Sequence, residues 1–318
     1  MANEMCCPLC GADKTELVTG RVRFGREADV RKCAACALVF LDQNSFVFPE
    51  DFYAAEYHQT YLTHVEPAAF DPRAYYEKMR VATAKWAEKL IPMFKGHEKV
   101  LDLGCSTGHL MTAIKDHVGS VHGHDLNLKE VEFCQKELGL DVSNQPLEQR
   151  FAEGSFDCIT MIYVLEHIAQ PVEFLHFAKR FLKPDGKLVI LVPNTQDPLV
   201  SFYDIPEFRA FYYCIEHVFY YDQRTIMALF DKAGLTGTVE TLQEYPLANH
   251  LNWAFTRKPS DTLASREGLP NVDLAPGAPR EAWKALWEQF NTQYARFLAE
   301  QGFGDRLWCV VGRGEGGA

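Results

Sequence analysis

The sequence predicts an α/β protein: a doubly wound parallel sheet with a small cysteine-rich module at the N-terminus. Two observations predict this architecture. Apolar strands alternate with helices from about residue 99 onward, and the first of them runs into a glycine turn between Gly104 and Gly108, as expected of an α/β sheet. Two Cys-x-x-Cys pairs precede this region. A chain of 318 residues is long enough for one sizeable domain and a smaller module.

Two cysteine pairs predict a metal-binding module over residues 1–42. The cysteines are Cys7, Cys10, Cys33 and Cys36. Each Cys-x-x-Cys turn brings two thiolates to one side of an ion, which suits tetrahedral Zn²⁺. The 22 residues between the pairs accommodate a hairpin with strands at 16–23 and 27–32. The module is therefore expected to be a zinc ribbon.

Three alternatives bear on this module. Cys6 competes with Cys7, although the Pro-Leu-Cys-Gly context favours Cys7. A redox dithiol pair is the alternative to zinc, but it would not need two such turns. A four-cysteine site has no open coordination position, so the predicted zinc is structural rather than catalytic. It folds a module that caps the substrate cleft or pairs subunits.

An aromatic linker and a long helix follow the module. Residues 43–71 are rich in aromatic and acidic side chains without a clear period, so we expect a linker. Asp71 and Pro72 predict the start of a helix that continues to about Met93, because Asp is a favoured N-cap and Pro fits the first turn. The doubly wound domain begins after this helix.

The glycine turn after strand 100–103 predicts the kind of ligand. A glycine turn lets the backbone approach a ligand and aims helix N–H groups at it. The dinucleotide pattern G-x-G-x-x-G lacks its middle glycine here, and Asp102 would repel a diphosphate. A carboxylate suits an ammonium group, so the turn favours S-adenosylmethionine over NAD. Asp125 follows strand 120–124, at the spacing of an acid that binds a ribose diol.

The remaining elements fit a seven-stranded, Rossmann-like sheet, of which six strands are located in the sequence. Further strands are expected at 156–162, 186–192, 238–243 and 305–312. A Lys-Pro-Asp-Gly turn at 183–186 separates the second of these from its preceding helix. Helices are expected at 223–233 and 282–301. The aromatic face of helix 282–301 belongs to the core or to a subunit interface, which would make a homodimer.

The motif Asp102-x-Gly104-Cys105-x-x-Gly108, with Asp125 and the segment Leu165-Glu166-His167, resembles class I S-adenosylmethionine-dependent methyltransferases over about residues 75–240. The resemblance implies cofactor contacts near the methionine, the ribose and the adenine. They are Asp102, Gly104, Cys105 and Gly108 at the methionine end, Asp125 at the ribose, Leu126 beside the adenine, and Met161. Gln145 stands where many relatives have Asp at the adenine amino group.

Residues 197–222 predict the acceptor site. This stretch is rich in aromatic residues, as a substrate pocket requires, although a hydrophobic lid over the core would have the same composition. For the catalytic base we favour His217, positioned by Glu216, and then His167, which in methyltransferases with this segment lies near the donor methyl. The expected substrate contacts are Tyr163, Tyr203, Asp204, Glu216, Tyr221 and His250.

The whole layout resembles bacterial methyltransferases with an N-terminal zinc ribbon that act on sugars, nucleotide-linked sugars or natural products. We therefore expect methyl transfer to a hydroxyl or an acidic carbon of a small molecule. The alternatives are an RNA or protein methyltransferase that uses the ribbon for binding, and a non-catalytic sensor. The net charge of −11 argues against nucleic acid as a partner. The sequence contains no signal peptide or membrane span, so the cytoplasm is the expected location.

Overall fold

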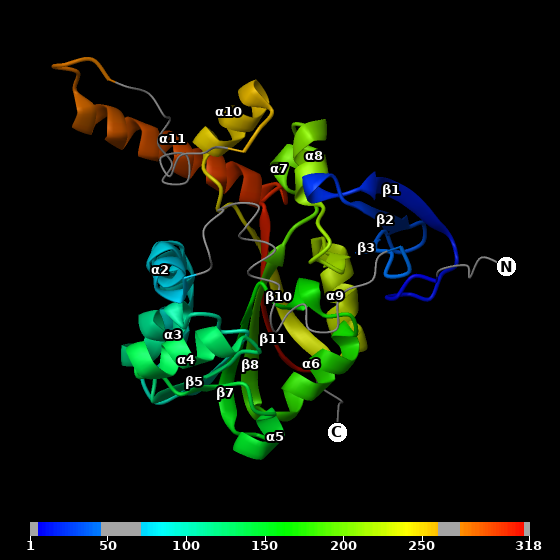
Figure 1. Cartoon of the computed structure of the whole chain (residues 1–318), viewed down its shortest axis with the longest axis vertical. Helices are drawn as coiled ribbons and strands as arrows, with labels where there is room; N and C mark the ends of the chain where they lie inside the picture. The colour runs from blue at the N-terminus through cyan, green and yellow to red at the C-terminus, as the bar shows by residue number, and fades with distance from the viewer. Residues whose placement is uncertain (1–5, 46–70, 260–273, 315–318) are drawn as a thin grey trace. The chain divides into compact units, whose positions relative to one another are not determined.

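The computed structural model describes residues 6–45, 71–259 and 274–314 (Figure 1). These residues form two compact units. The first contains the described residues of 1–46, 192–228 and 239–308, and the second those of 47–191, 229–238 and 309–318. Most of the predicted linker at 43–71 lies outside the described residues. Among the described residues, no helix is both long and apolar enough to cross a membrane.

A seven-stranded sheet forms the centre of the second unit and confirms the predicted α/β fold. The strand order is β10-β11-β8-β7-β4-β5-β6 (Figure 1). The strands are β4 (Lys99–Leu103), β5 (Ser120–His124), β6 (Val142–Ser143), β7 (Phe156–Ile162), β8 (Leu182–Pro193), β10 (Leu235–Leu242) and β11 (Arg306–Arg313). Strands β6, β5, β4, β7 and β8 pair in parallel. They read as apolar runs because helices cover both faces of a parallel sheet.

The strand order reverses at β4, which fixes where a ligand binds. The chain runs from β4 outward to β5 and β6 and then returns to β7 on the other side of β4. Ligands of doubly wound sheets bind at this switch point, beyond the carboxyl ends of the strands. The carboxyl end of β4 is where the glycine turn begins.

Helices and short 3₁₀ turns connect these strands. They are α2 (Pro72–Leu90), η3 (Ile91–Met93), α3 (His109–Ile114), η4 (Lys115–His117), α4 (Leu128–Glu137), α5 (Leu147–Arg150), η5 (Leu165–His167), α6 (Pro171–Arg180) and α9 (Gln223–Lys232). Asp71 caps α2, as predicted, by accepting a hydrogen bond from the backbone N–H of Arg73 at 3.0 Å. The buried hydroxyl of Thr83 in α2 lies 2.8 Å from Nδ1 of His109, which joins α2 to α3.

One expected boundary is different in the structure. The sequence predicts a turn at 183–186 before the strand, whereas β8 already begins at Leu182. Its register with β7 jumps from Phe156 opposite Leu182 to Cys158 opposite Lys187. The predicted turn residues therefore form an excursion within the strand rather than a break before it.

A four-stranded sheet with the order β1-β2-β3-β9 lies in the first unit. Its strands are β1 (Thr15–Arg21), β2 (Glu27–Cys33), β3 (Val39–Leu41) and β9 (Phe219–Tyr220), with the turn η1 (Arg23–Gly25) between the first two. The same unit contains α7 (Pro198–Ser201), α8 (Pro206–Tyr212), α10 (Leu247–Thr256) and α11 (Arg280–Glu300). Strand β9 comes from the aromatic stretch 197–222, so the sheet of the N-terminal module ends in a strand from that stretch.

Candidate active site

The glycine turn at the end of β4 has a backbone that only glycine fits at two positions. Gly104 and Gly108 both have φ of +71°, in the left-handed region that disfavours side chains. A Cβ on Gly104 would lie 2.5 Å from Val164, and one on Gly108 would lie 2.6 Å from Leu140. The two glycines therefore keep the turn tight against its neighbours, with the backbone of the turn at the switch point.

Asp102 is fully buried immediately before this turn. Its carboxyl accepts a hydrogen bond from the hydroxyl of Thr160 at 2.6 Å. Burial raises the pKa of Asp102 to about 7, and the nearby charge of Asp125 adds to this. A buried carboxylate without a cationic partner is costly, so this residue suits a ligand that brings a positive charge.

Asp125 follows β5 at the same edge of the sheet. Its two carboxyl oxygens accept hydrogen bonds from the backbone N–H groups of Ser106 at 2.8 Å and Asn127 at 2.9 Å. The Ser106 hydroxyl donates to buried Glu130 at 3.2 Å. Burial raises the pKa of both Asp125 and Glu130. These bonds orient Asp125 and leave further lone pairs for ligand hydroxyl groups.

Two residues of the turn escaped the sequence analysis. Ser106 has a positive φ of 48° and ties the turn to Asp125. The hydroxyl of Thr107 is buried and has no hydrogen-bond partner among the described residues. A buried polar group without a partner is rare, and it points to a ligand group not present here. Their position between the two glycines was the signal available in the sequence.

The other expected cofactor residues have different environments. Cys105 is buried in a core cluster with Met111 and Cys134, and Met161 is buried within β7. Leu126 is 54% exposed just beyond Asp125. Gln145 is exposed after β6, and its backbone N–H bonds to the Ser143 hydroxyl at 3.0 Å.

The end of β7 carries two further predicted residues, Tyr163 and His167. Tyr163 has a positive φ of 57°, and its ring meets that of Trp86 edge-on at 5.6 Å. A non-glycine residue in the left-handed region is often found at a functional site. His167 lies in η5 beside buried Glu166, and only 10% of its side chain is exposed. The sequence does not single out Trp86, which reaches this site from α2.

A family model described as a methyltransferase domain matches residues 75–240, slightly more than half of the chain. The chain belongs to this methyltransferase family. The seven-stranded sheet is the class I fold that the sequence predicted, and S-adenosylmethionine is the cofactor that the family implies. The glycine turn, buried Asp102, Asp125 at the end of β5 and the buried hydroxyl of Thr107 fit such a cofactor, because it carries an ammonium group, a ribose and several other polar groups.

Several known proteins are similar to this chain. An uncharacterised 37.1 kDa protein in transposon TN4556 of Streptomyces fradiae is 29% identical over 163 residues, covering 46% of each chain. The ubiquinone biosynthesis O-methyltransferase of Caulobacter vibrioides is 34% identical over 102 residues, covering 30% of this chain and 40% of the relative. The chain thus spans less than half the length of these relatives. A solved methyltransferase from Archaeoglobus fulgidus has a TM-score of 0.49 and 19% identity, covering 76% of this chain and 99% of that one.

The first unit of the chain contains the predicted base, His217, in the segment between α8 and β9. Glu216 is buried, and the ring of His217 lies 5.7 Å from that of Tyr220. The hydroxyl of Tyr220 donates to the carbonyl of Cys214 at 2.7 Å and accepts from its N–H at 2.8 Å. Tyr221 is buried as well. His217 thus lies in a short loop closed by one tyrosine hydroxyl.

A chain of side-chain hydrogen bonds joins two predicted substrate residues, Tyr203 and His250, in the same unit. Nδ1 of buried His250 lies 2.5 Å from the hydroxyl of Tyr294, which lies 2.9 Å from the hydroxyl of Tyr203. Burial lowers the pKa of His250 to about 3, so its imidazole is neutral. Nε2 lies 3.4 Å from the side-chain nitrogen of Gln243, whose two hydrogens are donated to the carbonyl of Tyr245 at 2.7 Å and to Asp305 at 3.0 Å. The sequence does not single out Tyr294, which is one of several aromatic residues in α11.

This hydrogen-bonded chain ends at the hydroxyl of Tyr203. If Nδ1 of His250 donates to Tyr294, then Tyr294 donates to Tyr203, and the hydrogen of Tyr203 is directed elsewhere. Tyr203 is 39% exposed and its neighbour Phe202 is 50% exposed. Asp204 follows with a positive φ of 49° and pairs with Arg209. The turn after α7 therefore presents an aromatic pair that carries one hydroxyl group.

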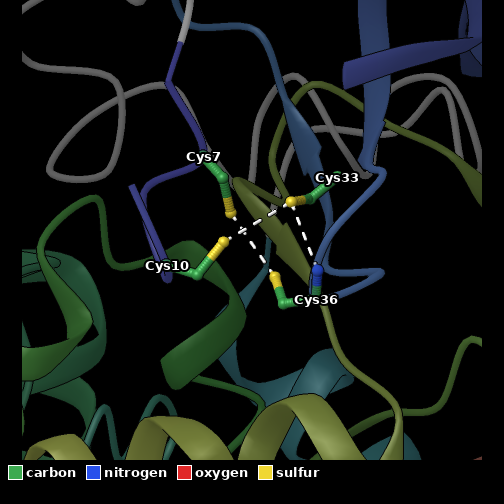
Figure 2. Close-up of side chains that lie close together, drawn as sticks. All are labelled: Cys7, Cys10, Cys33 and Cys36. Atoms are coloured by element: carbon green, nitrogen blue, oxygen red, sulfur yellow. Dashed lines mark hydrogen bonds between the residues drawn. The ribbon is translucent and has the colours of Figure 1, made fainter. Parts of the chain in front are cut away.

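The four cysteines of the N-terminal module point toward one another (Figure 2). The Sγ atoms of Cys7 and Cys36 are 3.6 Å apart, those of Cys10 and Cys33 are 3.5 Å apart, and all four lie within 4.8 Å of one another. Four sulfur atoms around tetrahedral zinc stand about 3.8 Å apart, given a bond of ~2.3 Å. Cys6 is exposed and is not part of this cluster.

Proposed function

We propose that the chain transfers a methyl group from S-adenosylmethionine to a small-molecule acceptor. The observation that carries this proposal is the glycine turn at the switch point, with buried Asp102 before it and the unpartnered hydroxyl of Thr107 within it. Bound S-adenosylmethionine supplies an electrophilic methyl group on a positively charged sulfonium.

The residues around the turn have distinct roles in this proposal. Asp102 binds the ammonium group, and Asp125 accepts hydrogen bonds from the ribose hydroxyls while Ser106 and Asn127 hold it in place. Thr107 donates to a polar group of the cofactor. Gly104, Cys105 and Gly108 form the cradle, and Leu126, Gln145 and Met161 are assigned to the adenine side. These roles fit the charge and hydrogen-bonding capacity of each residue.

A histidine removes the proton of the acceptor. Transfer to a hydroxyl or an acidic carbon releases a proton, and imidazole is the side chain best suited to accept it near neutral pH. We assign this role first to His217 and second to His167. The buried carboxylate of Glu216, next to His217 in sequence, supports the first choice.

The acceptor is a hydroxyl-bearing sugar, nucleotide-linked sugar or natural product. Two observations support a polar, ring-shaped acceptor: the hydroxyl of Tyr203 at the end of its hydrogen-bonded chain, and the exposed aromatic ring of Phe202 beside it. A relative named as an O-methyltransferase supports a hydroxyl as the acceptor group. Tyr163, Asp204, Tyr221 and His250 are assigned to the same binding role.

The four cysteines hold a structural Zn²⁺ ion in this proposal. The distances between their sulfur atoms suit a tetrahedral ion, and four thiolates fill its coordination sphere. The module at 1–42, the linker at 43–71, the methyltransferase domain at 72–318, the homodimer and the cytoplasmic location stay predictions.

Two measurements test the proposal. Titration calorimetry should show binding of S-adenosylmethionine and of its demethylated product, each weakened at least ~10-fold by Asp102→Asn. Mass spectrometry should then show a gain of one methyl group on a nucleotide-linked sugar or a phenolic acceptor in a panel. Absence of cofactor binding would overturn the proposal. Methylation of total RNA with no small molecule modified would favour the macromolecular alternative.

A further inference from the structure

The N-terminal module forms backbone hydrogen bonds with the loop that carries His217. Strand β3 of the module pairs with β9, with Val39 opposite Tyr220 and Phe40 opposite Phe219. Next to this pair, the N–H of Leu41 donates to the carbonyl of Val218 at 2.9 Å. The residues that follow His217 are therefore fixed by backbone bonds to residues 39–41.

Arg23 of the same module holds the residues that precede His217. Its Nε donates to the carbonyl of Phe211 at 2.6 Å, and its guanidinium lies 4.2 Å from the centre of the Phe211 ring. Its backbone N–H donates to the carbonyl of Tyr213 at 2.7 Å. One arginine thus uses a charge-assisted hydrogen bond, a cation–π contact and a backbone bond on a single short segment.

The loop between these two anchors is short and internally closed. Tyr220, the residue paired with Val39, bonds both the N–H and the carbonyl of Cys214. The five residues between them include Glu216 and His217. Because Tyr220 is fully buried, a shift of β3 would be transmitted to the closure of this loop.

The cysteine cluster is directly connected to these anchors. Cys33 is the last residue of β2, and β3 starts three residues after Cys36. The side chain of Arg224, which follows β9, donates to the carbonyl of Cys36 at 2.9 Å. Holding the four sulfur atoms together therefore fixes both ends of the turn that leads into β3.

We propose that the N-terminal module positions the His217 loop for catalysis and that Arg23 is its positioning residue. The inference rests on the proposed function in taking His217 as the base. It gives the module a role other than covering the substrate cleft or pairing subunits. Arg23 touches no reacting atom, and it acts through the backbone of residues 211–213.

The test compares Arg23→Ala and Arg23→Lys with Arg21→Ala in the full-length chain. Arg21 is an exposed arginine at the end of β1, two residues away, and serves as the matched control. Hydrogen exchange of residues 211–221 should accelerate at least ~10-fold in Arg23→Ala, partly recover in Arg23→Lys and stay unchanged in Arg21→Ala. With an acceptor from the panel, kcat should fall ~10- to 100-fold in Arg23→Ala, while the KM for S-adenosylmethionine stays within about twofold.

A second variant covers the case in which Arg23→Ala unfolds the module and loses zinc. Tyr220→Phe opens the loop closure and leaves the cysteines untouched, so zinc content by elemental analysis should stay at the wild-type level. Faster exchange confined to residues 214–220 and a lowered kcat are expected. Unchanged exchange and unchanged kcat in either folded variant would overturn the inference.

The outcomes separate this inference from the proposed base. If His217→Ala keeps full turnover, the base assignment is wrong, whatever Arg23 does. If His217→Ala loses turnover while folded Arg23→Ala keeps it, the base stands and the positioning role fails.

Discussion

Two buried polar residues at the glycine turn, Asp102 and Thr107, each reduce the stability of the unliganded fold. In the part of the chain that the structure describes, buried Asp102 has the neutral hydroxyl of Thr160 as its hydrogen-bond partner, and the buried hydroxyl of Thr107 has none. Both arrangements oppose folding unless a ligand relieves them. Burial of these groups is therefore better explained by ligand binding than by stability.

Asp102→Asn should weaken cofactor binding while it stabilises the unliganded protein. The pKa of Asp102 rises from 3.8 to about 7 on folding. The folded state therefore binds the proton of the Asp102 carboxyl group more tightly than the unfolded state does. The free energy of unfolding of the wild type therefore falls as pH rises through this window, and the cost is complete above pH ~7. Asn does not titrate and still accepts from Thr160.

Chemical denaturation at several pH values measures this effect. The advantage of Asp102→Asn over the wild type should grow between pH 4 and pH 7 and reach at least about 1 kcal/mol. Cofactor affinity of the wild type should rise over the same window, because the ammonium group favours the ionised acid. A variant that binds the cofactor as tightly as the wild type would contradict the role of Asp102.

At the scale of elements, the sequence predicted buried parallel strands best. The bounds of β5 and β7 match the expected ranges because each strand is a compact run between clear turn residues. The start of β8 was wrong because Lys-Pro-Asp-Gly has turn composition, and only the register with β7 reveals the excursion. Strand β9 was missed because two aromatic residues become a strand by pairing with β3, about 180 residues earlier.

In the candidate site, too, local motifs were predictable from the sequence and long-range contacts were not. Asp102, Gly104, Gly108 and Asp125 stand in a local motif, so their grouping was predictable from spacing. The bond between Tyr294 and His250 joins two separate helices, and the contact of Trp86 with Tyr163 joins α2 to the end of β7. Neither pair leaves a signal in one sequence, since tertiary packing alone brings these residues together.

Gly108→Ala should disrupt the element formed by the turn and α3. The new Cβ would meet Leu140 at 2.6 Å and Cys134 at 3.0 Å, in addition to the strain of a φ of +71°. Gly139→Ala is the matched control, because Gly139 has a φ of +63° and nothing within 4 Å. Left-handed strain alone costs about 1–2 kcal/mol.

Thermal or urea unfolding should therefore show that Gly108→Ala lowers the free energy of unfolding by at least about 1 kcal/mol more than Gly139→Ala does. Only Gly108→Ala should also weaken cofactor binding. Equal losses in the two variants would show that the contacts around the turn relax freely.

At the scale of the whole molecule, the residues of the proposed function are distributed over the two compact units. The glycine turn lies in one unit, and the loop of His217 lies in the other together with the cysteine cluster. In the proposed function, the small N-terminal module depends on its zinc ion for folding. Loss of the metal should therefore reduce methyl transfer and leave cofactor binding unchanged.

Removal of zinc by a chelator under reducing conditions should abolish methyl transfer and leave cofactor affinity within about twofold. The reason is that the four thiolates fix the turn into β3 and, through it, the loop of His217, whereas Asp102, Thr107 and Asp125 belong to the other unit. On one zinc-depleted sample, calorimetry with the demethylated cofactor measures cofactor binding, and a turnover assay measures methyl transfer. Added Zn²⁺ should restore the activity. Loss of cofactor binding in parallel with activity would contradict this division, as would full activity at a zinc content near zero.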